Sequence, residues 1–195
     1  MDEEIKKLNQ MKDTFIAFME SLLKYYKNAL TREVVFAGMI TKKTIDILDA
    51  TSFAFKKYNI TVHISLLRLL CDNCIAIQSV KELDLKTVMD MIQNNERVNT
   101  IMIDEEQNMS DGYLKRKVAI DYPGFDKVYK FACDSVHFSK QAMASSFIKD
   151  KDGNILPHFE VGNKEMKNTI LQNNNSMVTV SKIILDMLKD VCVER

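Results

Sequence analysis

The sequence predicts an all-α fold, a bundle of long helices with a small β-hairpin near the C-terminus. Five Gly and two Pro in 195 residues are few, which favours long regular elements over a sandwich or barrel with many turns. Apolar residues recur at helical spacing over most of the chain. A chain of this length can bury one good core, so we expect a single helical domain over residues 1–195, with the hairpin insertion at about 147–161.

Six stretches in the first three quarters of the chain have the apolar periodicity of helices. They are 3–29, 32–57, 61–80, 84–93, 112–119 and 123–145. Thr31 is a helix-start residue, and Tyr58-Asn59 is the expected break before the third helix. Residues 94–111 are polar and acidic, and we expect a loop or a short helix there.

The pattern changes after Ser146. An Asp-Gly turn between short alternating runs predicts the hairpin. We then expect Asn163 to cap a helix that runs to about Leu171, and Ser176 to begin a separate last helix.

The bulk composition excludes several classes of protein. Lys plus Arg equals Asp plus Glu, so a uniformly cationic nucleic-acid binder is not expected. Four scattered Cys do not form a disulfide framework, and reduced thiols are the default. The N-terminus is charged from the start, and Arg68 and Asp72 interrupt the longest apolar stretch, so we expect a cytoplasmic protein with no membrane contact.

Arg68 and Asp72 form the first candidate site. They lie one turn apart in a narrow polar lane on the most apolar helix, where an i,i+4 ion pair can form. One interpretation is a solvent-facing stripe on a mostly buried helix. The other is a partly buried pair in which Asp72 holds Arg68 ready to bind an anion or to orient a catalytic group, and we predict that the two are partly buried and paired.

The 123–145 helix carries the second candidate site. Its polar face contains Lys130, Asp134, His137 and Gln141 at helical spacing. The simple interpretation is an amphipathic helix with an exposed His. The functional interpretation makes His137 a general acid–base, because its ordinary pKa of about 6.5 suits that role and a carboxylate one turn away at Asp134 favours the protonated ring.

Two motifs resemble a known group. Leu-Leu-Arg-Leu-Leu-Cys-Asp-Asn at 66–73 and Tyr-x3-Cys-Asp-Ser-Val-His-Phe-Ser at 129–139 resemble uncharacterised bacterial helical proteins that pair an Arg-x3-Asp/Glu helix with a Ser-x-His-x-Ser helix. That group is similar to the HEPN superfamily, whose small helical bundles occur in toxins, RNases and phage-defence proteins. The resemblance implies a homodimer with two motif helices facing each other.

The resemblance also implies a site for metal-independent RNA cleavage without a cofactor. In ribonucleolytic members four to six residues separate an Arg from the His. Here Lys130, with six residues between it and His137, occupies the position of that Arg. His137 would then be the acid–base and Arg68 would stabilise the phosphate charge from the neighbouring helix. The supporting residues would be Asp72, Lys130, Asp134 and Ser139. The alternative is a non-catalytic helical protein that uses the same fold to dimerise or to hold a protein partner.

A zinc site competes for some of these residues. Three thiols and one imidazole could surround a tetrahedral Zn²⁺, supplied by Cys71, Cys74, Cys133 and His137. The first pair lies in mid-helix without a knuckle turn, and buried Cys often serves as a small apolar residue. We therefore expect no bound metal.

Overall fold

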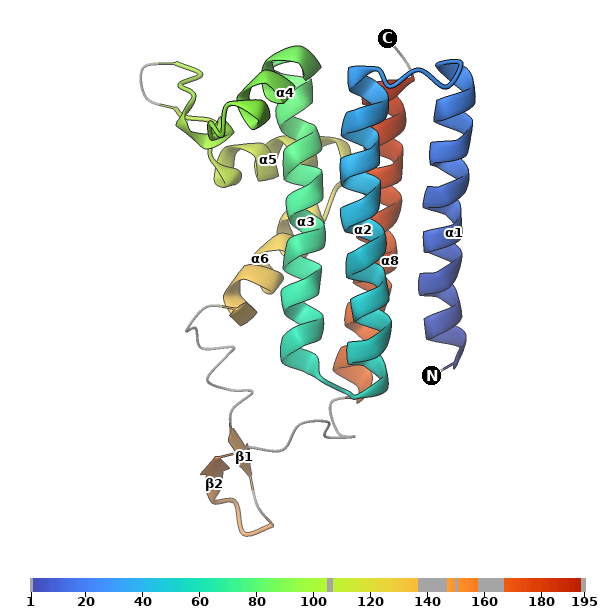
Figure 1. Cartoon of the computed structure of the whole chain (residues 1–195). Coiled ribbons are helices and arrows are strands. Elements are labelled where there is room, and N and C mark those ends of the chain that lie inside the picture. The colour runs from blue at the N-terminus through green and yellow to red at the C-terminus, as the bar shows by residue number, and fades with distance from the viewer. Residues whose placement is uncertain (1, 105–106, 137–146, 150, 158–166, 194–195) are drawn as a thin grey trace.

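The computed structural model describes residues 2–104, 107–136, 147–149, 151–157 and 167–193. It confirms an all-α fold with one small two-stranded sheet (Figure 1). The elements are α1 (Asp2–Tyr25), α2 (Arg32–Lys56), α3 (Ile60–Glu82), α4 (Leu85–Gln93), η1 (Val98–Thr100), α5 (Asp111–Asp121), α6 (Phe125–Val136), β1 (Phe147–Lys149), β2 (Ile155–Pro157) and α8 (Lys167–Cys192).

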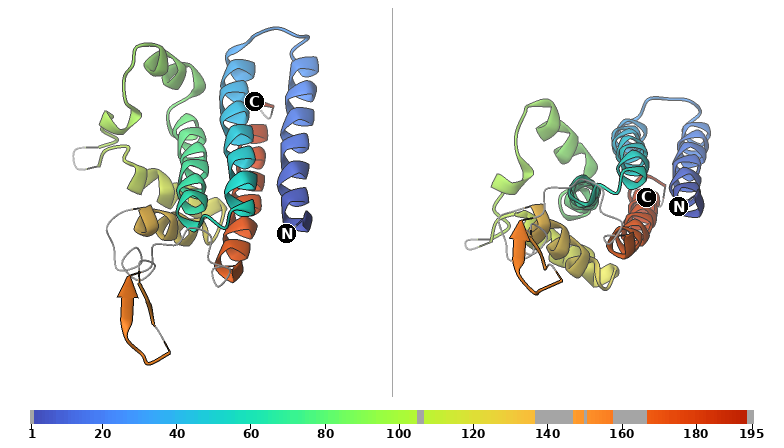
Figure 2. Two further views of the ribbon diagram at one scale, coloured as in Figure 1. Left: turned by 60° about the horizontal axis from the view of Figure 1, so that its bottom comes forward. Right: turned by 90° about the horizontal axis from the view of Figure 1, so that it is seen from below.

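Four long helices, α1, α2, α3 and α8, form the inner bundle (Figures 1 and 2). Asn174 near the start of α8 hydrogen-bonds Glu4 near the start of α1, and the Tyr26 hydroxyl after α1 donates to the Cys192 carbonyl at the end of α8. The α8 helix therefore runs parallel to α1 and antiparallel to α2. Fully buried apolar side chains fill the space between the four helices, among them Leu8, Phe15, Leu48, Leu67, Leu70, Met177 and Ile184.

The connections between the long helices follow from local capping. Thr31 accepts a hydrogen bond from the Val34 amide and caps α2, as the sequence predicts. Asn59 instead caps α3 by accepting from the Val62 amide, and Tyr58 takes the left-handed conformation (φ 51°) that ends the preceding helix. Within the predicted break, Tyr58 thus ends α2 and Asn59 caps α3.

The α3 helix belongs to both layers of the molecule. One side packs in the inner bundle, and the other side carries α4, α5 and α6, which with η1 form an outer layer (Figure 2). Asp84 caps α4 and Ser110 caps α5, so each outer helix begins at a defined point beside α3. The surface between α3 and the outer layer contains the candidate site.

One expectation about helix bounds is wrong, and others concern residues that the structure does not describe. The predicted break before Ser176 is wrong, because α8 continues from Lys167 to Cys192. Asn173 and Asn174 are buried inside it, and the Asn174 amide bonds Glu4 instead of ending the helix. The α6 helix is described to Val136, so the rest of the predicted 123–145 helix, with His137, Ser139 and Gln141, lies outside the described residues, as do Asn163 and the end of the predicted hairpin segment.

The predicted hairpin is present, with β1 and β2 antiparallel and Ile148 opposite Leu156. Figure 1 shows it apart from the helical bundle. Among the described helices, α3 alone is long and apolar enough to cross a membrane, and half of its most apolar stretch is buried inside the protein. A core helix of a folded bundle has the same length and composition.

Candidate functional site

Arg68, at the middle of α3, is the centre of a side-chain cluster that joins α3 to α6. Its Nη2 donates to the Tyr129 hydroxyl at 2.6 Å, and its Nε donates to the Cys133 Sγ at 3.0 Å. The guanidinium carbon also lies 4.2 Å from the centre of the Tyr129 ring, a cation–π contact. Because Tyr129 and Cys133 are one turn apart on α6, both reach the same guanidinium.

Two carboxylates complete the cluster. Asp72 forms an ion pair with Arg68 Nη1 one turn along α3, and Asp111 Oδ2 lies 3.4 Å from Arg68 Nη2 and 3.3 Å from the Tyr129 hydroxyl. The side chains of Arg68 and Asp72 are 18% and 32% exposed, so the predicted partly buried pair is confirmed. Asp111 is the first residue of α5, where a negative charge interacts favourably with the helix dipole.

The surroundings of Tyr129 determine the protonation state of its hydroxyl. Burial raises the pKa of Tyr129 well above its usual range, and the neighbouring Asp111 raises it further against the opposing effect of Arg68. The phenol therefore stays protonated. Partial desolvation, followed by the positive charge of Arg68, lowers the pKa of Lys43, an exposed residue of α2. Each nitrogen of the Arg68 guanidinium has a protein group beside it. Nε hydrogen-bonds Cys133, Nη2 contacts Tyr129 and Asp111, and Nη1 forms the ion pair with Asp72 but no hydrogen bond of good geometry.

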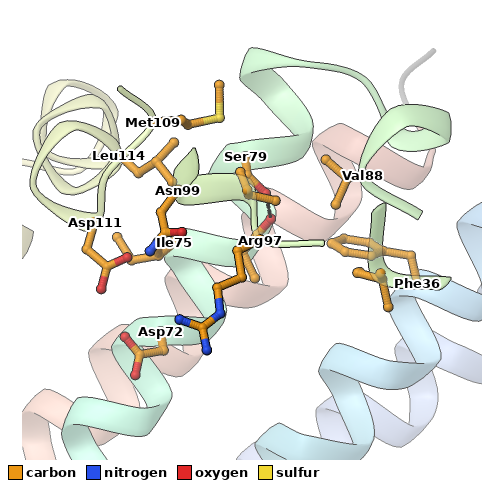
Figure 3. Close-up of a pocket in the computed structure, with 13 residues that line it drawn as sticks. Phe36, Asp72, Ile75, Ser79, Val88, Arg97, Asn99, Met109, Asp111 and Leu114 are labelled. Atoms are coloured by element: carbon orange, nitrogen blue, oxygen red, sulfur yellow. Dashed lines mark hydrogen bonds between the residues drawn. The ribbon is translucent and has the colours of Figure 1, made fainter. Parts of the chain in front are cut away.

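A pocket of about 380 Å³ lies next to this cluster, between α3, α4, η1 and α5 (Figure 3). Its walls are mainly apolar and come from Phe36, Ile75, Ala76, Val88, Ile92, Val98, Met109 and Leu114. Its polar groups are Asp72, Ser79, Arg97, Asn99 and Asp111. The pocket and the Arg68 cluster therefore share two carboxylates, Asp72 and Asp111.

Several charged groups at the pocket retain bonding capacity. Asp72 contacts Arg68 through Oδ1, and Asp111 makes its contacts through Oδ2. Within the described part of the chain, the other oxygen of each carboxylate has no polar contact. The Arg97 guanidinium likewise has no carboxylate partner among the described residues.

The structure brings some of the predicted site residues together and does not describe others. The structure brings Arg68 and Asp72 together, and Lys130 pairs with Asp134 at 2.7 Å on the exposed face of α6. His137 and Ser139 lie outside the described residues. Sequence reasoning missed Tyr129, Asp111 and the pocket. The Tyr129–Cys133 spacing of four residues next to an apolar stripe was a usable signal, because it places both side chains on the α6 face that covers α3.

The thiols of α3 are buried. Burial raises the pKa of Cys71 to about 12 and that of Cys74 well above its usual range, so both prefer the protonated form that binds metals poorly. No group of three or more His, Cys, Asp or Glu side chains suited to a metal occurs among the described residues. Cys133 contacts Arg68, and His137 is not described, so the expectation of no zinc stays a prediction.

Comparison with protein-family models, with curated proteins and with solved structures finds no match for this chain. The resemblance to HEPN-like proteins, and the homodimer that it implies, therefore stay predictions. The Arg68 cluster and the adjacent pocket are the features of the described residues that bear on function.

Proposed function

We propose that this protein is a non-catalytic helical binding protein that holds its ligand in the pocket between α3, α4, η1 and α5. The observation that carries the proposal is the sharing of Asp72 and Asp111 between the Arg68 cluster and the pocket. In this interpretation Arg68 is a clamp that fixes α5 and α6 on α3, and it presents two oriented carboxylates to a ligand.

The contacts of Arg68 favour a clamp over a catalytic group. A guanidinium that binds a scissile phosphate needs N–H groups directed at the substrate. Here the three nitrogens contact Asp72, Tyr129 and Cys133, with Asp111 as a fourth partner. Phosphate binding would have to replace these contacts, whereas a ligand in the pocket would leave them in place.

The size and lining of the pocket suit a small molecule or one side chain of a partner. Ligand sites are usually concave, mostly apolar and about 300–1,000 Å³ in volume, with a few polar groups that fix orientation. The pocket at α3 has this combination.

The test is a titration with apolar fragments of about the size of indole, followed by amide NMR spectra. We expect saturable shifts in Ala76, Val98 and Leu114, which line the pocket from three elements. Ala76→Leu should abolish these shifts by filling the pocket, whereas Ala50→Leu on the exposed surface of α2 should leave them unchanged. Absence of saturable shifts, or shifts that survive in Ala76→Leu, would contradict the proposal.

Metal-independent RNA cleavage, in a toxin or phage-defence protein, is the second candidate. It is supported by the exposed Lys130–Asp134 pair, which lies on the α6 face predicted to carry His137. On this hypothesis His137→Ala abolishes RNA cleavage or cell toxicity and leaves the melting temperature unchanged, and His158→Ala is the matched control. Unchanged activity in folded His137→Ala protein would exclude His137 as the catalyst.

A further inference from the structure

The charged groups of the pocket differ in sign and come from different elements. Asp72 and Asp111 come from α3 and α5, and each has one carboxylate oxygen without a polar contact in the described part of the chain. Arg97 comes from the segment before η1, and its side chain extends across the pocket toward α3 (Figure 3). It lies beyond ion-pair distance of both carboxylates.

The pocket is therefore lined by opposite charges that are not paired with each other. Arg68 is shared by two carboxylates, so the Asp72–Arg68–Asp111 group has an excess negative charge beside the pocket. Arg97 supplies a positive charge, and the Asn99 amide lies near it in the sequence and also lines the pocket. A purely cationic ligand would leave Arg97 without a partner, and a purely anionic ligand would face the spare oxygens of Asp72 and Asp111.

The remaining walls are apolar. Ile75 and Leu114 lie beside the carboxylate side of the pocket, and Phe36 and Val88 line it from α2 and α4. A ligand that fills the pocket must therefore combine an apolar body with two opposite charges.

We infer that the ligand is a small zwitterion with an apolar body, of which a hydrophobic α-amino acid is the simplest example. This inference rests on the proposed binding function. The ammonium group would lie at Asp72 and Asp111, the carboxylate at Arg97 and Asn99, and the side chain against the apolar walls. The contacts at both ends are charge-assisted hydrogen bonds, which are the stronger class.

The experiment compares by calorimetry four probes that share the phenethyl carbon skeleton and differ in charge. L-phenylalanine carries both charges, phenethylamine carries only the ammonium, 3-phenylpropionate carries only the carboxylate, and N-acetyl-L-phenylalaninamide carries neither. We expect L-phenylalanine to bind at least about tenfold more tightly than each of the other three, because one charge-assisted hydrogen bond contributes about that factor.

Two variants locate the charges. Arg97→Gln should remove the advantage of L-phenylalanine over phenethylamine, and Asp111→Asn should remove its advantage over 3-phenylpropionate. Arg116→Gln and Asp126→Asn, which lie outside the pocket, are the matched controls and should keep the wild-type ranking.

The outcomes separate this inference from the proposed function. If the apolar fragments bind the pocket but the four probes bind equally, or one singly charged probe binds best, the zwitterion inference is wrong and the binding function stands. If neither fragments nor probes bind the pocket, both are wrong. L-phenylalanine binding that is unchanged in Arg97→Gln and Asp111→Asn would place it elsewhere and overturn the inference.

Discussion

The inner bundle and the outer layer use polar residues in opposite ways. At the centre of the inner bundle, polar side chains are fully buried and neutral, as in the hydrogen bond from Asn73 on α3 to Thr44 on α2, and charged pairs such as Lys12–Asp49 lie at its surface. In the outer layer, α5 and α6 are fixed to α3 by charged groups that are partly exposed around Arg68. Buried neutral polar groups constrain how helices pack, whereas partly exposed charges remain available to a ligand.

This difference predicts which substitutions should destabilise the whole protein and which should destabilise the outer layer alone. A change inside the inner bundle alters the packing of α3 with α2 and α8, on which both layers depend. A change at the Arg68 cluster should loosen α5 and α6 while the inner bundle remains folded. The pocket lies between the two layers, so its shape depends on both.

The largest predicted effect concerns His63, a fully buried residue near the start of α3. The Asn174 side chain approaches its ring, but neither ring nitrogen makes a hydrogen bond of good geometry, and burial lowers its pKa from 6.5 to about 4. The folded state therefore holds a neutral ring where the unfolded state binds a proton. We expect the free energy of unfolding to fall by up to about 3 kcal/mol as pH decreases from 6.5 to 4.

The matched variant for this prediction is His63→Leu, measured by urea unfolding across the same pH range. Glu4 nearby has a lowered pKa, mainly through its hydrogen bond from Lys7, so some acid destabilisation will remain in the variant. The His63 contribution is the difference between the two pH profiles. Parallel profiles would show that His63 does not titrate as its burial implies.

The second predicted effect is a smaller loss of stability, in the outer layer. Arg68→Met leaves Asp72, Asp111 and the Tyr129 hydroxyl without their shared partner. We expect the free energy of unfolding to fall by about 2 kcal/mol. This is less than the roughly 3–5 kcal/mol for breaking a fully buried pair, because both carboxylates are partly exposed. Asp72→Ala should lose only about 1 kcal/mol, since Asp111 still holds Arg68.

Hydrogen exchange tests whether this loss is local. Amides of α5 and α6 should exchange faster in Arg68→Met, whereas those of α1 should exchange as in the unchanged protein. Arg116→Met on the exposed side of α5 is the control and should leave amide exchange in all three helices unchanged. Equal acceleration in α1 and α6 would contradict the division into an inner bundle and an outer layer.

The sequence predicted most of the fold because helix periodicity and capping are local properties. The helix starts at Thr31 and Asp84 follow from residues within one turn. The false break before Ser176 shows the limit of this reasoning. Asn173 and Asn174 favour turns in isolation, but burial in the bundle and the bond from Asn174 to Glu4, 170 residues away, keep α8 continuous.

The candidate site was only partly predictable for the same reason. The Arg68–Asp72 pair is local, one turn apart on α3, and could be predicted. The contacts of Arg68 with Asp111 and Tyr129 join residues 43 and 61 positions apart, and no periodicity encodes them. Arg97 lay in a stretch expected to be a loop or short helix, and its position at a pocket depends on how η1 packs beside α3.

The smallest predicted effect compares two ion pairs of the same i,i+4 type. Lys130 and Asp134 are 70% and 43% exposed, far more than Arg68 and Asp72, and we expect Lys130→Met to lose only about 0.3–0.5 kcal/mol. Most of that loss should disappear in about 1 M NaCl, which screens exposed charges, while the loss in Arg68→Met should persist. Urea unfolding at low and high salt measures both. A loss at Lys130 as large as that at Arg68, and insensitive to salt, would mean that this face of α6 is covered in solution. That outcome would favour the face-to-face dimer implied by the HEPN resemblance over an exposed helix surface.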